Sequence, residues 1–191
     1  MSAALVRRIA LASLAAAALS TAASCSTPED GRVGVSGPPG PVAPQAWEVG
    51  NALLYTCGSL DCHGSKYRNM RVYGFGGLRA DPSMLPSGEG TTDAELALTY
   101  RAVVGLEPEV MTNVTREKSG YDRLALVRKA KGLDNHKGGN RMASGSAMEK
   151  CLLSWLGSAT DVDACNAASL PTNVVKPAAD AGADAKAGDG G

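Results

Sequence analysis

Two cysteines and a histidine share one short loop of this chain, which reads Cys57-Gly-Ser-Leu-Asp-Cys62-His63. Two thiols can add to the two vinyl groups of one porphyrin, and a His directly after the second Cys can ligate its iron. Covalent haem-attachment sites usually have the spacing C-x-x-C-H. Here four residues separate Cys57 from Cys62. The loop therefore predicts a haem c site with an enlarged spacing.

The same residues allow two other interpretations. A bond between Cys57 and Cys62 would close the loop as a small disulfide and leave His63 without an iron. Alternatively, the two cysteines, His63 and His136 form a Cys₂His₂ donor set of the kind that binds zinc. Outside the cytoplasm these thiols would need protection from oxidation, which disfavours zinc.

The N-terminus predicts export from the cytoplasm. Arg7 and Arg8 precede an apolar stretch at 9–19 that is too short to span a bilayer. Small residues then lead to Cys25, a pattern that resembles the lipobox of bacterial lipoproteins, in which this Cys is acylated. We expect 1–24 to be a signal peptide and Cys25 to anchor the protein in the cell envelope, in the periplasm or at the outer membrane. Cleavage after an Ala would instead leave a soluble exported protein.

The number of cysteines agrees with lipid attachment. The chain has five, an odd number that leaves one to explain in an exported protein. If Cys25 is acylated, the remaining four form two pairs. Cys57 and Cys62 are one pair, and Cys151 and Cys165 are the other, which we expect to form a disulfide in an oxidising compartment.

Composition divides the chain into four segments. After the signal peptide, residues 25–43 are rich in Pro, Gly and Ser and predict a flexible, lipidated linker. A single domain is expected at 44–168, and the Ala, Gly and Asp-rich tail at 169–191 is expected to be disordered. Loss of 1–24 removes two Arg and no acidic residue, so the net formal charge falls from 0 to −2. No basic stripe predicts nucleic-acid binding.

Apolar periodicity and capping signals predict a mainly α-helical domain with long loops. The expected helices run over 45–56, from the capping box at Thr92 to the stop at Gly105, over 121–131, and from the capping box at Ser146 to the stop at Gly157. The last helix carries an apolar stripe that includes Met148 and Cys151, so these residues are expected in the core.

Both ends of this domain resemble a class I cytochrome c. Gly50 and Leu53 precede the attachment motif, Gly64 follows it, and Trp155-Leu156 forms an aromatic–Leu pair on the last helix. The resemblance implies a small helical domain whose first and last helices cross, with Gly50 against Trp155. It does not cover residues 66–140, and the four-residue spacing between the cysteines departs from the family pattern.

The middle of the chain is similar to a narrower group, the exported bacterial cytochrome-like domains that include the planctomycete type. Two segments carry this similarity, Gly77-Leu-Arg79 and His136-Lys-Gly-Gly139.

The cytochrome resemblance implies His63 as the proximal iron ligand and leaves the distal ligand open. A Met in the loop before the last helix is the usual ligand in the family, and Met142 lies there. His136 would instead give a bis-His iron of lower potential. Met70 is a more remote candidate, and Met148 is expected to pack in the core.

These expectations describe a membrane-tethered lipoprotein that transfers single electrons in the cell envelope, and an electron carrier rather than an enzyme. Its redox partner is not identified by the sequence. The alternative is a disulfide-stapled exported lipoprotein with a binding or structural role and no haem. A third interpretation is a redox accessory module that docks on a larger dehydrogenase.

Overall fold

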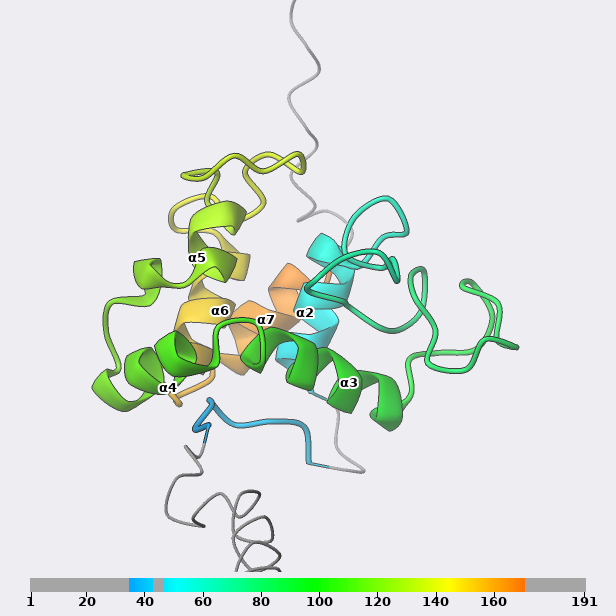
Figure 1. Cartoon of the computed structure of the whole chain (residues 1–191), viewed down its shortest axis with the longest axis horizontal. Coiled ribbons are helices and arrows are strands. Elements are labelled where there is room, and N and C mark those ends of the chain that lie inside the picture. The colour runs from blue at the N-terminus through cyan, green and yellow to red at the C-terminus, as the bar shows by residue number, and fades with distance from the viewer. Residues whose placement is uncertain (1–34, 43–46, 171–191) are drawn as a thin grey trace, which may run out of the picture. The chain divides into compact units, whose positions relative to one another are not determined.

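The computed structural model describes residues 35–42 and 47–170 (Figure 1). The expected signal peptide, the lipidation site Cys25 and the tail from 171 onward lie outside these residues. The described part of the chain is mainly helical and contains no strand, in agreement with the predicted fold class. Its helices are α2 (Glu48–Cys57), α3 (Asp93–Val104), α4 (Pro108–Glu117), η3 (Tyr121–Arg123), α5 (Ala125–Ala130), α6 (Ala147–Leu156) and α7 (Val162–Ala168).

Local capping places two helices where the sequence predicts them. Thr92 caps α3 with its side chain, and Glu95 reaches back to the Thr92 N–H, which completes the capping box. Ser146 caps α6 by accepting from the Glu149 N–H, whereas the Glu149 carboxylate accepts from the Gly145 N–H at 2.6 Å. None of the described helices has the length and apolar character needed to cross a membrane.

Other helices differ from the expectation. The predicted helix over 121–131 is divided at Leu124, whose extended backbone separates η3 from α5. Helices α4 and α7 are not among the helices predicted from the sequence. In α4, Pro108 stands at the first position, where its missing N–H has no intrahelical partner to lose.

The hydrophobic core lies where α2, α6 and α7 pack together, with α3 alongside them (Figure 1). The apolar stripe of α6 faces inward, since Leu152, Trp155 and Leu156 have no exposed surface. Three aromatic rings meet at one edge of this core. Trp47 lies edge-on to Tyr100 and to Trp155, with centroid separations of 5.7 Å in each case. This packing fixes α2, and with it the cysteine loop at its end.

Gly50 lies on α2 at a point of close approach. A Cβ there would lie 2.9 Å from Leu96 and would overlap the Trp47 ring. The Trp47 ring lies against the glycine and packs edge-on against Trp155. The need for a small residue at Gly50 is therefore confirmed, and the nearest neighbours of a Cβ there are Trp47 and Leu96.

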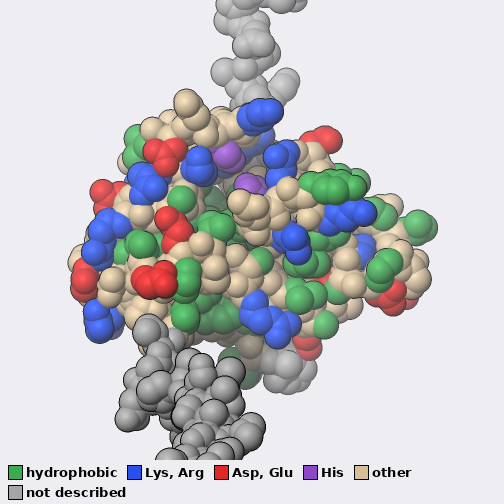
Figure 2. Space-filling view, in the orientation of Figure 1, with side chains coloured by type: hydrophobic (Ala, Val, Ile, Leu, Met, Phe, Trp, Pro, Cys, Tyr) green, Lys and Arg blue, Asp and Glu red, His purple; other side chains and the backbone are tan. Residues whose placement is uncertain are grey.

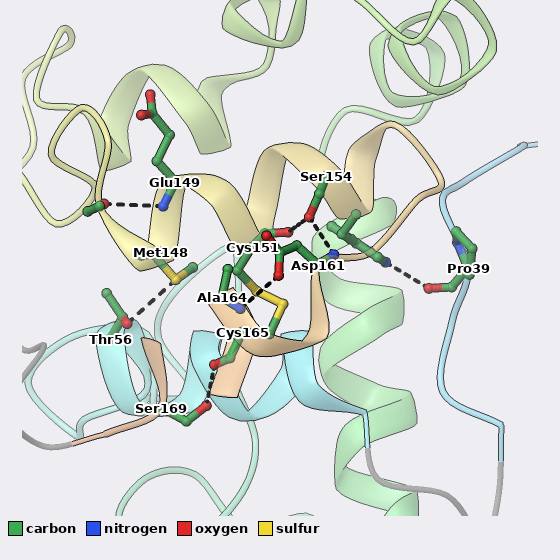
Figure 3. Close-up of a disulfide and its surroundings, with 12 residues drawn as sticks. Pro39, Thr56, Met148, Glu149, Cys151, Ser154, Asp161, Ala164, Cys165 and Ser169 are labelled. Atoms are coloured by element: carbon green, nitrogen blue, oxygen red, sulfur yellow. Dashed lines mark hydrogen bonds between the residues drawn. A yellow bond between two sulfur atoms is a disulfide. The ribbon is translucent and has the colours of Figure 1, made fainter. Parts of the chain in front are cut away.

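The disulfide that the sequence predicts joins α6 to α7 (Figure 3). Cys151 and Cys165 are bonded, with their Cα atoms 4.6 Å apart, and neither has exposed surface. Asp161 caps α7 by accepting from the Ala164 N–H at 2.9 Å, and its own N–H donates to Ser154 on α6. The chain after α6 is therefore held against that helix by a covalent bond and by hydrogen bonds.

A buried ion pair fixes the long loop before α3. Arg79 and Glu95 are almost fully buried, and the guanidinium donates to the carboxylate at 2.7 Å. Arg79 also donates to the carbonyl oxygens of Leu85, Glu89 and Gly90. Burial would raise the pKa of Glu95, but hydrogen bonds from Arg79 and from backbone N–H groups outweigh it and lower that pKa. The loop is thereby tied to the start of α3.

Residues 35–42 do not form the flexible linker that the composition predicts. They lie against the helical domain, and their carbonyl oxygens accept hydrogen bonds from Tyr100 and Trp155. The Pro and Gly content predicts a free chain, because composition carries no information about side chains of distant helices that can bind the segment.

Candidate functional site

Helix α2 carries Cys57 as its last residue, so the helix itself places the first thiol of the cysteine loop. The loop that follows is closed by its own backbone. The His63 N–H donates to the Cys57 carbonyl at 2.9 Å, and the Cys62 and Gly64 N–H groups both donate to Ser59. Arg68 donates to the carbonyl oxygens of Asp61 and Cys62 from outside. The four-residue spacing therefore forms a hydrogen-bonded turn that brings the backbone of His63 next to that of Cys57.

Two glycines allow this loop to pack tightly. A Cβ at Gly64 or at Gly77 would overlap the carbonyl oxygen of Gly58. A Cβ at Gly77 would also lie 3.3 Å from the Cα atom of Gly64, so three chain segments meet without side chains between them. Close approach of the backbone therefore explains why glycine stands at Gly64, after His63, and at Gly77, in the Gly77-Leu-Arg79 segment.

His63 is half-buried, and one of its ring nitrogens is occupied. Its Nδ1 lies 3.0 Å from the Met70 carbonyl oxygen, so Nδ1–H donates to the backbone and Nε2 is left with its lone pair. Burial lowers the pKa of His63, and the nearby His136 and Arg68 act in the same direction against the hydrogen bond to Met70. The neutral ring, which is the form that binds metals, is therefore favoured at neutral pH.

His136 lies in the loop between α5 and α6 and is oriented in the same way. Its Nδ1 lies 3.1 Å from the Gly139 carbonyl oxygen, again leaving Nε2 with its lone pair. Gly139 has a φ of 67°, in the left-handed region, and a Cβ at Gly138 would lie 2.9 Å from the His136 ring. Both glycines of the His136-Lys-Gly-Gly139 segment are therefore needed to shape the turn that holds this imidazole.

The two histidines of the chain face each other across more than 70 residues of sequence. Their ring centroids lie 6.1 Å apart, and the ring planes differ by 26°. Figure 2 shows both side chains on one face of the molecule, with Lys and Arg side chains around them. Folding therefore brings together the only two imidazoles of the chain, each held by a backbone carbonyl.

Two neighbouring cavities open at this pair. One has a volume of about 450 Å³, the other about 510 Å³, and both are lined by Cys57, His63 and His136. Cys62 lines the second cavity, and Leu106 and Leu126 give the first an apolar wall. Each volume falls within the range of roughly 300–1,000 Å³ that is typical of cofactor sites.

Cys57 and Cys62 are half-buried free thiols in the structure, so the intraloop disulfide of the alternative interpretation is not formed here. Burial raises the pKa of the Cys57 thiol to about 12, with a further contribution from Cys62. Within residues 35–42 and 47–170, no three His, Cys, Asp or Glu side chains converge as a metal-ion site. The Cys₂His₂ zinc set is therefore not assembled.

Two of the three methionines considered from the sequence, Met142 and Met148, line neither cavity. Met142 is fully buried in the hydrophobic core and lines neither cavity. Met148 is in the core, as predicted, and its sulfur accepts from the Thr56 hydroxyl at 3.6 Å. Met70 lines the first cavity, but its contact with His63 is made by its carbonyl oxygen. Of the distal-ligand candidates, His136 is the one whose donor atom is oriented by a backbone bond beside His63.

Cationic side chains predominate around the two cavities. Arg68 and Arg141 line both, Lys129 lines the first and Lys137 the second. The carboxylates in the lining are Asp61 and Glu107, and Glu107 accepts from the Ala125 N–H at 2.6 Å. The site thus favours a ligand that carries negative charge.

No protein-family model, curated protein or solved structure matches this chain. The function of the site is therefore argued from its own residues and geometry.

Proposed function

We propose that this domain binds one haem c and transfers single electrons. In this proposal Cys57 and Cys62 hold the porphyrin covalently, and His63 and His136 ligate its iron. The bound haem would supply a one-electron redox couple, with a lower potential than a His/Met centre has.

The observation that carries the proposal is the relationship between the two imidazoles. A histidine binds a metal through a ring nitrogen at about 2 Å, so two histidines that hold one metal would have to lie close together. The ring centroids of His63 and His136 lie 6.1 Å apart and both rings line the same two cavities, so these two residues would hold the iron together. Nδ1 of each ring faces a backbone carbonyl oxygen, and a hydrogen bond of this kind orients histidines that bind metals.

The surroundings fit the rest of a haem. Both thiols open onto cavities that the imidazoles also line, and Leu106 and Leu126 give an apolar surface for a porphyrin face. A haem also carries two carboxylates, for which Arg68 and Arg141 on the cavity walls would supply opposite charge.

We further propose that the mature protein is attached to the envelope membrane through a lipid on Cys25, as the N-terminal pattern predicts. Attachment would restrict the domain to redox partners in the envelope. In the alternative function, the stapled lipoprotein without haem, the loop thiols would pair with each other and the histidines would carry no iron.

Reversible redox titration tests the proposal. The full chain should be produced with a c-type maturation system and its absorption spectrum followed between oxidising and reducing potentials. We expect a single one-electron transition with the spectrum of a low-spin, six-coordinate haem. A protein that is exported and folded but has no visible chromophore would favour the stapled lipoprotein.

A further inference from the structure

The segment 35–42, which we name the strap, reads Val35-Ser-Gly-Pro-Pro-Gly-Pro-Val42 and lies against three helices. The Trp155 indole N–H of α6 donates to the Pro39 carbonyl oxygen at 2.7 Å (Figure 3). The Tyr100 hydroxyl of α3 donates to the Pro38 carbonyl oxygen at 2.8 Å, and the Ser36 N–H donates to a side chain of α4. Pro38 is buried in this position.

Three aromatic rings form the surface below the strap, and we name this surface the aromatic groove. Its rings belong to Trp47, Tyr100 and Trp155, with centroid separations between 5.7 and 6.4 Å. Grooves lined by aromatic rings, with indole and phenol groups that donate to backbone carbonyls, bind proline-rich peptides. Burial raises the pKa of Tyr100, so its hydroxyl remains protonated and available as a donor at neutral pH.

The strap has the sequence that such a groove requires. Pro38 and Pro39 have no N–H group to satisfy, and their restricted backbone loses little entropy on docking. The flanking glycines allow close contact. A Cβ at Gly37 would lie 2.9 Å from Val104, and one at Gly40 would lie 3.1 Å from the Tyr100 ring. The strap is therefore complementary to the aromatic groove in shape and in hydrogen bonding.

We propose that the strap is a proline-rich ligand bound in cis, which sets the length of chain between a lipid on Cys25 and the domain. This inference rests on the proposed lipid attachment. With the strap docked, the ten steps from Cys25 to Val35 reach at most roughly 35 Å. With the strap released, the 22 steps from Cys25 to Trp47 reach at most about 75 Å.

The docked strap would thus keep the domain that carries the histidine pair within the shorter distance of the membrane. Its release would let the same site reach partners farther from that surface. The tether therefore has two lengths. It is short when the strap occupies the aromatic groove and long when the strap is released.

Docking is tested first, on the full mature chain with Cys25→Ser so that no lipid is involved. Gly37→Val and Gly40→Val should each displace the strap, because the added atoms would collide with Val104 or Tyr100. Val42→Ala is the matched control, since this strap residue is 66% exposed. Exchange of the Trp155 indole proton with solvent, followed by NMR, should be slow in the parent and control and at least tenfold faster in both Gly variants.

Unchanged exchange in both Gly variants, with helix content preserved by circular dichroism, would overturn docking. Trp155→Phe assigns the indole signal. This part of the test is independent of lipid and haem.

The distance of the domain from the membrane is then measured by neutron reflectometry, with the lipidated protein on a supported bilayer. We expect the parent and Val42→Ala to lie within the shorter limit and Gly40→Val to extend beyond it. Equal heights for Gly40→Val and the parent would overturn the two-length tether. Failure of the parent to bind the bilayer would overturn lipid attachment, and with it the tether, while leaving the exchange result and the haem proposal intact.

Discussion

The imidazoles of His63 and His136 face each other at a centroid separation of 6.1 Å, and each directs Nδ1 toward a backbone carbonyl oxygen. His63 is fixed by the cysteine loop after α2, and His136 is fixed by a glycine turn after α5. Two unrelated local structures thus leave two Nε2 atoms available at one place, which is the chemical basis of the proposed bis-His iron.

The choice between His136 and Met142 as the second ligand can be tested by substitution. His136→Ala should change the low-spin spectrum of the haem-loaded protein, because one imidazole is lost, and should shift the potential. Met142→Leu conserves volume in the core and should leave both unchanged, at a cost below about 1.5 kcal/mol in stability. Potentiometry with optical detection measures both variants. A potential that moves in Met142→Leu but not in His136→Ala would contradict the proposed ligand set.

The thiol of Cys57 should react slowly in the folded, haem-free chain. Its pKa is raised to about 12 from an ordinary value of 9.0, chiefly by burial, so at pH 8 the reactive thiolate is suppressed. The thiolate fraction should be about 1,000-fold lower than in the unfolded chain. Site-resolved mass spectrometry after timed iodoacetamide treatment measures the alkylation rate of Cys57.

The same shift has a consequence for stability. The folded state holds the Cys57 proton more tightly than the unfolded state, so this contribution to stability is complete below pH 9 and is lost as the pH rises toward 12. Equal alkylation rates in the folded and urea-unfolded chains at pH 8 would show that Cys57 is not protected.

Much of the helical framework could be predicted because its signals are local. The capping boxes at Thr92 and Ser146 each act within one turn, and α3 and α6 begin directly after them. The disulfide between Cys151 and Cys165 followed from counting cysteines, without any knowledge of α7. Helix α4 also carries a local signal, because Pro108 stands at its first position and Met111 and Val114 follow at helical spacing.

The rest depends on contacts between distant segments. Composition indicates a free linker at 35–42, because the groove that binds it is formed by residues far along the chain. The family resemblance favours Met142 as a ligand, yet the structure buries it in the core. His136 could be recognised as a candidate from its glycine-rich loop, but its position opposite His63 is a property of the folded chain.

Loss of the disulfide should weaken the domain. Replacing both Cys151 and Cys165 with Ala frees a loop with a sequence separation of 14, for which the chain-entropy model gives a loss of about 3 kcal/mol in the free energy of unfolding. Urea unfolding followed by circular dichroism measures this loss, and reduction of the parent protein should reproduce it. An unchanged urea midpoint in both would contradict a stabilising role for the bond.

The buried carboxylate of Glu95 should contribute far more to the stability of the domain than the exposed carboxylate of Glu89. Glu95→Ala leaves Arg79 buried without its counter-charge and removes half of the α3 capping box, so the melting temperature should fall by at least about 10 °C. Glu89→Ala is the control, because the Glu89 side chain is exposed and only its carbonyl oxygen contacts Arg79. Similar melting temperatures for the two variants would show that the ion pair does not hold the loop.

Covalent attachment of haem is the most direct test of the proposed function. The full chain and its Cys57→Ser/Cys62→Ser variant should be produced with a c-type maturation system and compared on a denaturing gel stained for haem peroxidase activity. Covalent haem survives denaturation, so we predict a stained band at the size of the parent chain and none for the variant. A parent chain that is present on the gel but does not stain would contradict the haem proposal.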